Sequence, residues 1–432
     1  MFRPTPFHRK LVAVVAVVAT AGSLAACSGS SSSSDADTVV WSTWGTPEEL
    51  TRFEEFNDEF MKRHPEITVE LQPVASYGDY HSKLLAQLTS RTAPDVFYIG
   101  DDKIGQFVDA DVLLPLTDLM ESKESQTQPD DFFPGLFGAA QADDEIYAAP
   151  NDANPDVLWY DKVALEAAGI TEDPAELAEQ GRWTTDAYLD MNARLAEAGL
   201  TGSLFWNYWA THSSWISSQG GTAFDESGDF VGNTDPATLD AVETLGEQFQ
   251  NGTFVVADSL PEGAGADSLF VSHKAGFFSQ GRYTIGTVKS AGEEASYDIV
   301  RWPTPDGAAA PTGVATSYLA INGKSQNTDA AFTFWTEFLS AEGQTFRLQG
   351  GGNAVPSIKG ADEVVLEDDY PAHAQTFLDM RDIGFEDHPT VAAVPGLSTD
   401  ISDVMLSLYE GKSDAQGTLD TIADLIANAS GK

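Results

Sequence analysis

Strand and helix patterns alternate along the first hundred residues of the chain. A β-branched and aromatic run at 37–44 precedes a helix that Thr46 and Glu49 should begin as N-cap and capping-box partner. Alternating strand patterns follow at 67–71 and 95–99, with a second helical stretch between them. Parallel strands need crossover connections, which helices supply. The sequence therefore predicts an α/β fold built on a largely parallel sheet.

Helical patterns dominate from residue 161 onward. We expect helices at 161–168, 185–198 and 236–249, and a helical tail at 399–428. The 395 residues after position 37 exceed what one compact core usually holds. The chain should therefore form two lobes, the second more helical than the first.

The N-terminus has the pattern of a secretory signal peptide, residues 1–26. Three basic residues precede the apolar run Leu11–Thr20, which is too short to span a bilayer. Leu24-Ala25-Ala26-Cys27 resembles the bacterial lipobox, in which the cysteine carries the lipid anchor; a plain signal peptide with an incidental cysteine is the alternative. A small, polar stretch, 27–37, reads as a flexible tether. We expect an extracytoplasmic chain anchored to the outer face of the cell membrane through Cys27.

The charge of the chain excludes some partners. Acidic residues number 67 against 23 basic ones, and removal of the signal peptide would change the formal charge from −44 to −47. Nucleic acid and anionic lipid head groups are therefore disfavoured partners. With 42% hydrophobic and 10% aromatic residues the composition is that of a globular protein, so the acidity belongs to the surface.

Nine short motifs follow one another over nearly the whole chain. They are VVWSTWG (39–45), FNDEF (56–60), APDV (93–96), YAAP (147–150), LWYDK (158–162), WTTD (183–186), GGTAFD (220–225), KAGF (274–277) and GGGNAVP (350–356). In this order they resemble the extracellular solute-binding proteins of carbohydrate-type ABC transporters, the class of the maltose-binding protein. No single motif is diagnostic.

The resemblance implies a two-lobed periplasmic-binding-protein-like fold with discontinuous lobes and a hinge. Such a lipoprotein would be a monomer without cofactor or enzymatic activity. It would bind a small solute, here a mono- or oligosaccharide, and deliver it to ABC permease subunits. We expect chain crossings near 150–155, 311–317 and 353–357, where Pro, Gly and small polar residues permit hinge torsions.

The expected lobes are assembled from separate stretches of chain. The first would combine 38–150 with 317–353, and the second 155–311 with 357–432. Sugars present apolar ring faces edged by hydroxyls, so their sites need flat aromatic side chains and a few directional polar groups. Such residues lie at the sheet edge, at the crossings and in aromatic runs.

Three candidates lie at the carboxyl edge of the first sheet, where ligands of open α/β sheets bind. Trp44 and Thr46 follow the first strand, and Asp102 follows the third. Trp44 could instead belong to the core, although Trp41 is the better core candidate. Asp102 could be an ordinary surface acid in so acidic a chain.

Further candidates lie on the crossings. Asp152 and Asn154 fall on the first and could reach a ligand from the hinge side, but turn chemistry beside Pro155 explains them equally well. Asn353 lies at the start of the third crossing and is expected to contact ligand as well.

An aromatic run supplies two more candidates. In a helix, the aromatic residues between Phe205 and Trp215 would point in several directions, so they cannot all enter one core. We expect Trp206 and Trp215 to line the cleft and Trp209 to belong to the core.

Arg282 and Tyr283 follow the strand pattern at 275–278, where relatives commonly carry Gly-Pro-Trp with the aromatic ring stacked on the sugar. Tyr283 can still stack. Arg282 adds a charge that could bind an anionic group or pair with an acid, which puts a purely neutral sugar in doubt.

Two other functions remain open from the sequence. A secreted glycoside hydrolase would need two carboxylates close together in a cleft, and acids are plentiful; no nucleophile motif and no metal-ligand spacing among the seven histidines is present. An adhesion or structural lipoprotein would bind no small ligand. A polyol or an anionic solute also remains possible as the ligand.

Overall fold

The computed structural model describes residues 37–74, 77–142, 144–260 and 265–429. The signal peptide 1–26, Cys27 and all of the tether except Asp37 lie outside the described residues. Within the described residues, none of the helices has the length and apolar character needed to cross a bilayer.

Strands and helices alternate as expected over the first hundred residues, and the later part is richer in helix. The main strands are β1 (Asp37–Ser42), β2 (Ile67–Leu71), β3 (Val96–Gly100), β6 (Ala148–Pro155), β7 (Val157–Asp161), β8 (Thr201–Phe205), β9 (Phe254–Val256), β10 (Ala275–Gln280), β11 (Tyr297–Val300) and β12 (Val314–Ile321). Two short strands, β4 (Gln141–Ala142) and β5 (Glu145–Ile146), form a hairpin.

The helices include at least one in each predicted stretch, together with others outside those stretches. They are α1 (Pro47–Arg63), α2 (Tyr77–Ser90), α3 (Asp101–Asp109), α4 (Thr117–Met120), α5 (Lys162–Ala167), α6 (Pro174–Glu179), α7 (Thr185–Glu197), α8 (Trp209–Ser218), α9 (Pro236–Gln250), α10 (Ala266–Val271), α11 (Thr284–Ala291), α12 (Thr328–Leu339), α13 (Ala341–Leu348), α14 (Gln375–Ile383), α15 (Pro389–Ala392), α16 (Leu397–Tyr409) and α17 (Ala415–Ala429). The tail expected as one helical region is two helices, α16 and α17.

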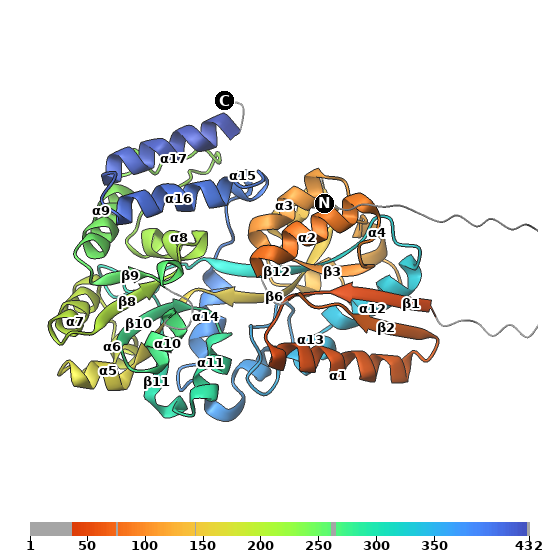
Figure 1. The fold of residues 1–432 in the computed structure, drawn as a ribbon, viewed down its shortest axis with the longest axis horizontal. Helices are drawn as coiled ribbons and strands as arrows, with labels where there is room; N and C mark the ends of the chain where they lie inside the picture. Colours follow the sequence, from red (N-terminus) through yellow and green to blue (C-terminus); the bar gives the residue numbers. More distant parts are fainter. Residues whose placement is uncertain (1–36, 75–76, 143, 261–264, 430–432) are drawn as a thin grey trace, which may run out of the picture. The chain divides into compact units, whose positions relative to one another are not determined.

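The first sheet has the strand order β2-β1-β3-β12-β6, and with its covering helices it is called the first lobe below. β1 is parallel to β2 and β3, as predicted, whereas β12 is antiparallel to both β3 and β6. Helices α1, α12 and α13 lie on one side of the sheet and α2 and α3 on the other (Figure 1). The sheet is buried on both faces, which explains its continuous apolar strands.

Local sequence signals set the start of α1 and the core beneath it. The Thr46 hydroxyl accepts from the Glu49 N–H at 3.3 Å while the Glu49 carboxylate accepts from the Thr46 N–H, so the predicted capping box is confirmed. Trp41 is fully buried, as expected, and its indole N–H donates to Asn57 at 3.2 Å. Phe53 packs edge-on against Trp41, with ring centroids 5.4 Å apart.

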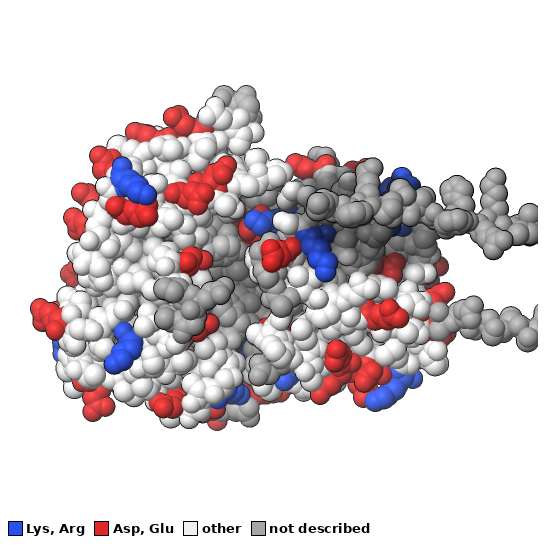
Figure 2. Space-filling model, in the orientation of Figure 1, with Lys and Arg blue, Asp and Glu red and all other residues white. Residues whose placement is uncertain are grey.

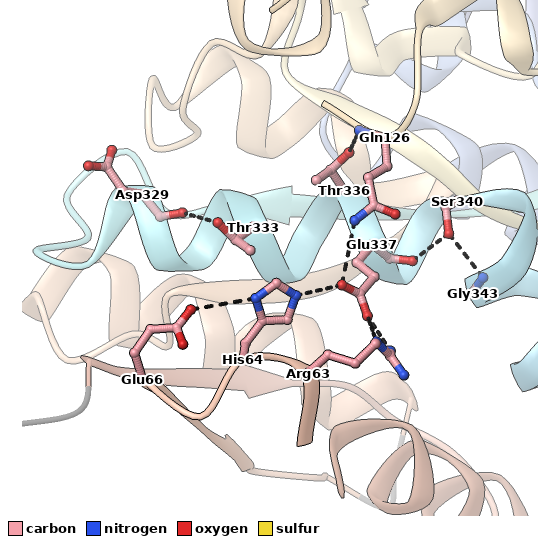
Figure 3. Close-up of polar contacts among 10 residues, drawn as sticks. All are labelled: Arg63, His64, Glu66, Gln126, Asp329, Thr333, Thr336, Glu337, Ser340 and Gly343. Atoms are coloured by element: carbon pink, nitrogen blue, oxygen red, sulfur yellow. Dashed lines mark hydrogen bonds and ion pairs between the residues drawn. The ribbon is translucent and has the colours of Figure 1, made fainter. Parts of the chain in front are cut away.

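The end of α1 is tied to α12 through one buried carboxylate, Glu337, in the cluster of Figure 3. Arg63 donates to it from Nε at 2.8 Å, His64 Nε2 lies 2.8 Å away, and Gln126 approaches at 3.5 Å. Only 9% of the Glu337 side chain is exposed. Buried charges are usually paired, and Glu337 meets that requirement with three partners from two segments.

The second sheet has the order β11-β7-β10-β8-β9, and with its helices it forms the second lobe. β8 is parallel to β9 and β10, whereas β7 is antiparallel to β10 and β11. The chain passes from the first sheet to the second at Asp156, between β6 and β7, and returns between β11 and β12. Asp152 and Asn154 lie within strand β6, so this crossing is extended and the turn interpretation does not hold.

The C-terminal third of the chain contacts both lobes. Val355 pairs with Ala153 of β6, and α15 packs on α3 of the first lobe before α16 and α17 join the second. A Cβ on Gly105 would lie 2.3 Å from the carbonyl oxygen of Ala392, so glycine allows the close approach of α3 and α15. The lobes are therefore discontinuous in sequence.

Candidate functional site

The first-lobe wall of the site is a group of aromatic and acidic side chains at the carboxyl ends of β1 and β3. Trp44 is partly buried and packs edge-on against Tyr77, with centroids 4.9 Å apart. The Tyr77 hydroxyl donates to Asp102 at 2.7 Å, and Lys103 pairs with the second oxygen of Asp102 at 2.7 Å. Trp44 and Asp102 thus meet through Tyr77, which the sequence interpretation did not include.

Asp101 links the two lobes. It begins α3 of the first lobe, and its carboxylate accepts from the Tyr208 hydroxyl at 2.6 Å and from the Trp209 indole N–H at 3.0 Å, both from the second lobe. Burial, reinforced by the charge of Asp102, raises the pKa of Asp101 to about 7. Trp209 is buried as expected, yet it and Tyr208 are also the residues through which the lobes meet.

The second-lobe wall lies at the ends of β8 and β10. Trp206 donates from its indole N–H to Gln280 at 3.1 Å and packs on Phe278 with centroids 5.8 Å apart. The ring of Tyr283 is 43% exposed, the most solvent-accessible of the predicted aromatic candidates. A flat, exposed ring beside directional polar groups is what a pyranose face requires.

Asn154 of β6 contacts this wall from the hinge. Its amide oxygen accepts from the Arg282 backbone N–H at 3.0 Å. A Cβ on Gly281 would lie 2.6 Å from that oxygen and 2.7 Å from the Tyr283 ring. Gly281 therefore lets Asn154 and Tyr283 lie against the same stretch of backbone, and the structure brings these candidates together with Trp206.

Arg282 does not reach a surface. It is 1% exposed, and its guanidinium donates to four backbone carbonyls, of Leu348, Gly352, Ala354 and Val364, at 2.8–3.2 Å. Burial lowers the pKa of Arg282 to about 10, which leaves it charged. Because its guanidinium N–H groups hold the third crossing in place, we leave Arg282 out of the site. Without Arg282 in the site, the argument for an anionic ligand has no basis.

Trp215 also lies in the interior. It is fully buried, its indole N–H donates to the Ala241 carbonyl at 2.8 Å, and it packs in the second-lobe core beside Trp302. The reason is local: β8 ends at Phe205 and α8 begins at Trp209, so the aromatic run is a strand end, a loop and a helix rather than one helix. We leave Trp215 out of the site as well.

Three other candidates have structural partners. Thr46 is exposed and caps α1. Asp152 is 4% exposed, with one oxygen accepting from Ser317 at 2.6 Å and the other from Asn151 at 2.7 Å; burial raises its pKa to about 6. Asn353 is partly buried in the third crossing, and the carbonyls of its two neighbours, Gly352 and Ala354, accept from Arg282.

The residues that sequence reasoning missed are Tyr77, Tyr208 and Gln280. Tyr208 belongs to the aromatic run between Phe205 and Trp215 and precedes α8, and Tyr77 opens the helix after the second strand, at the edge where Trp44 was expected. Gln280 ends β10 just before Gly281. The available signal was a strand end for Gln280 and a helix start for Tyr77 and Tyr208.

Acidic side chains are spread over the face shown in Figure 2, where Lys and Arg are few. Among the described residues, no group of three or more His, Cys, Asp or Glu side chains is arranged to hold a metal ion. The walls of the site instead offer aromatic rings, amides and carboxylates.

Solved structures share the fold. An ABC substrate-binding protein from Listeria monocytogenes in complex with cycloalternan superposes with a TM-score of 0.80, at 19% identity, over 92% of this chain and 100% of that chain. The GacH receptor of Streptomyces glaucescens, solved unliganded and with acarbose, gives 0.77 at 19% identity over 91% and 98%. These likenesses confirm the two-lobed fold.

Characterised relatives are similar in sequence over part of their length. A maltotriose-binding protein from Pyrococcus abyssi is 25% identical over 311 residues, 68% of this chain and 61% of the relative. An arabinooligosaccharide-binding protein from Halalkalibacterium halodurans is 27% identical over 196 residues, 44% of this chain and 39% of the relative. The match thus spans less than two thirds of each relative.

The family model that matches this chain describes bacterial extracellular solute-binding proteins and covers residues 44–345. That range contains the strands of both sheets except β1, and both walls of the site. The chain belongs to the bacterial extracellular solute-binding protein family.

Proposed function

We propose that this protein captures a carbohydrate between its two lobes and delivers it to an ABC importer. The observation that carries the proposal is the exposed Tyr283, which approaches Asn154 at Gly281, one residue after Gln280, the residue to which Trp206 donates. Relatives named for maltotriose and arabino-oligosaccharides, and structures with cycloalternan and acarbose, favour an oligosaccharide.

The proposed site combines both walls. Tyr283 and Trp206 would stack on sugar rings, and Asn154, Asp102 and Trp44 would supply hydrogen bonds and a further ring. Carbohydrate sites use this division of labour because ring faces are apolar and their edges are hydroxylated. Because the two walls belong to different lobes, a ligand that contacts both favours the closed arrangement.

The proposed lobes remain 38–150 with 317–353 and 155–311 with 357–432. The hinge would include Asp156, which separates the strands of the two sheets, and the stretch before β12. Closure about such connections is a common response of two-lobed receptors to ligand. The outer faces of the closed lobes would then meet the permease subunits.

The first experiment is calorimetric titration of the mature chain with maltose, maltotriose, arabinotriose and acarbose. One carbohydrate class should bind, and Tyr283→Ala and Trp206→Ala should each weaken it about tenfold or more, since a stacked ring contributes on the order of 1–3 kcal/mol. Tyr147→Ala, a partly buried tyrosine of the first lobe, is the matched control. No response to any carbohydrate, or variants that bind like the parent, would contradict the proposal.

The alternatives have less support. The family is one of solute-binding proteins and not of hydrolases, and nothing in the site favours paired catalytic carboxylates over binding groups. A purely structural lipoprotein would not need the exposed Tyr283 beside the contact that Asn154 makes with the backbone at Gly281. Turnover of a glycoside by the purified chain would revive the hydrolase reading.

We also propose that Cys27 anchors the mature chain to the outer face of the cell membrane. The support is the lipobox-like sequence after an apolar signal, together with the extracellular character of the family. Cells given a labelled fatty acid should transfer the label to the parent chain and not to Cys27→Ala. The Cys27→Ala chain should also be absent from the membrane fraction. Equal labelling of both chains would contradict the anchor.

A further inference from the structure

The second lobe contains a hollow that the carbohydrate proposal does not use. It is called the second-lobe pocket here and is enclosed by α8, α9, α15, α16, α17 and the segment that holds Phe224 and Phe230. Its volume is about 70 Å³, and most of the surface of its wall is apolar. A water molecule needs about 10–15 Å³ by the same measure, so the pocket has room for roughly five water-sized groups.

Five polar side chains also line the pocket: His212, Ser213, Thr238, Asp387 and Ser398. His212 of α8 is 5% exposed, and neither ring nitrogen has a hydrogen-bond partner among the described residues. Asp387, just before α15, is 9% exposed; its Oδ1 accepts from the His388 N–H at 2.9 Å, and Ser398 lies beside its carboxyl. Buried polar groups in folded proteins nearly always have a partner, so the two ring nitrogens of His212 indicate an occupant.

His212 and Asp387 are uncharged at neutral pH. Burial lowers the pKa of His212 to about 3, which leaves a neutral imidazole with one N–H donor and one acceptor nitrogen. Burial, with the charge of Asp101, raises the pKa of Asp387 to about 8, so that it is mostly a carboxylic acid. The wall therefore offers hydrogen bonds without net charge.

From these observations we propose that the second-lobe pocket binds a small, uncharged, mainly apolar group that carries a hydroxyl or ether oxygen, such as a phenol or a phenyl ether. The apolar part would fill the space between α8, α16 and α17. Its oxygen would pair with His212 or Asp387. An unmodified sugar does not fit this chemistry, because its hydroxyls would face an apolar wall.

Two sources could supply that group: a free small molecule, or the aglycone of a glycoside bound in the candidate site. Trp209 connects the two places, since its ring lines the pocket while its indole N–H donates to Asp101 at 3.0 Å. Occupancy of the pocket therefore bears directly on the contact between the lobes. Only the aglycone source rests on the proposed function.

The test uses phenol and toluene as probes of the mature chain, with binding followed by NMR titration. Phenol should bind more tightly than toluene by about fivefold, the worth of one neutral hydrogen bond. His212→Phe combined with Asp387→Leu should abolish that preference, and Ala223→Leu, which places a larger side chain in the pocket wall, should weaken both probes about tenfold. Ala196→Leu, on the exposed face of α7, should change neither.

A paired measurement distinguishes the sources. If phenyl β-glycosides bind more tightly than the parent sugars and Ala223→Leu removes only that gain, the group is an aglycone. If phenol binds while no sugar does, the proposed carbohydrate function fails and the pocket assignment stands. If phenol does not bind at millimolar concentration, or binds Ala223→Leu and the parent chain alike, the pocket assignment is overturned.

Discussion

At the scale of single residues, the site depends on a glycine whose missing side chain lets two others approach. Gly281 lies 2.6 Å, measured from an added Cβ, from the Asn154 amide oxygen, and 2.7 Å from the Tyr283 ring. Nothing in the sequence around Gly281 indicates which residues would approach it, because Asn154 lies more than a hundred positions away. The sequence shows the glycine, but it does not show which side chains require a glycine there.

Gly281→Ala should destabilise the protein by about 1–3 kcal/mol, because Asn154 and Tyr283 must shift to make room. Carbohydrate affinity should fall in parallel. Gly286→Ala, on α11 with nothing within 4 Å of an added Cβ, should instead stabilise it by about 1 kcal/mol. Urea unfolding measures the free energy of unfolding of both variants. An unchanged value for Gly281→Ala would show that Asn154 and Tyr283 do not pack tightly against Gly281.

A second residue prediction concerns Asp156 at the crossing between the lobes. Asp156 is 7% exposed, accepts from Ser279 at 2.7 Å, and burial raises its pKa to about 7. Since the unfolded carboxyl titrates near 4, the folded state holds the extra proton between about pH 4 and 7. The contribution of Asp156 to stability is therefore present below pH 4 and is lost as the pH rises to 7.

Asp156→Asn removes this titration. The free energy of unfolding of the parent chain, relative to that of the variant, should decrease by up to about 1.4 kcal/mol per pH unit across this window. Asp190→Asn, an exposed acid with a 69% accessible side chain, should leave the slope as it is. Urea titrations at pH 4.5, 5.5, 6.5 and 7.5 give the free energy of unfolding of each chain. If it depends on pH in the same way for the parent and for Asp156→Asn, the titration of Asp156 does not contribute to stability.

At the scale of elements, α3 and the loop before α8 hold the lobes together through Asp101. Tyr208 donates to it at 2.6 Å and Trp209 at 3.0 Å. A hydrogen bond to a charged group is worth about 1.5–3 kcal/mol. Because these bonds run between lobes rather than within one, their loss should act on the closed arrangement more than on either lobe.

Tyr208→Phe should therefore increase the separation of the lobes and weaken ligand binding, while each lobe stays folded. Spin labels at the exposed positions Glu54 and Glu243 would report the separation. Tyr160→Phe is the matched control, since the Tyr160 hydroxyl donates to Asp173 at 2.7 Å inside the second lobe. An unchanged label distance in Tyr208→Phe would mean that the α3–α15 packing alone holds the lobes.

At the scale of the whole molecule, the excess of acid sets the response to salt. The chain carries a formal charge of −44, and acidic side chains are spread over the face shown in Figure 2. Like charges repel one another in the compact state, and salt screens that repulsion over about 10 Å at 0.1 M and about 3 Å at 1 M. Few of these acids have a basic partner, because Lys and Arg are scarce.

The melting temperature should rise when NaCl is raised from about 0.05 to about 1 M, with most of the gain at the lower end, where screening changes fastest. A neutral osmolyte such as sucrose, which stabilises without screening, is the control and should give a gradual rise instead. Differential scanning calorimetry measures both. A decrease with salt would indicate that favourable ion pairs outweigh the net repulsion.

The sequence determined the local elements and the class of fold. The capping box at Thr46, the parallel strands β1, β2 and β3, the core position of Trp41 and the two-lobed α/β architecture follow from periodicity, caps and chain length. It also determined the strongly acidic character of the surface, because composition alone fixes net charge.

Only the tertiary structure decided what the candidate side chains face. Arg282 and Trp215 look like site residues along the chain, but Arg282 donates to four carbonyls between Leu348 and Val364, and Trp215 packs in the core around Ala241. Asp101, one residue from the predicted Asp102, turned out to join the lobes. Burial and partners arise from segments far apart in sequence, and local patterns carry no record of them.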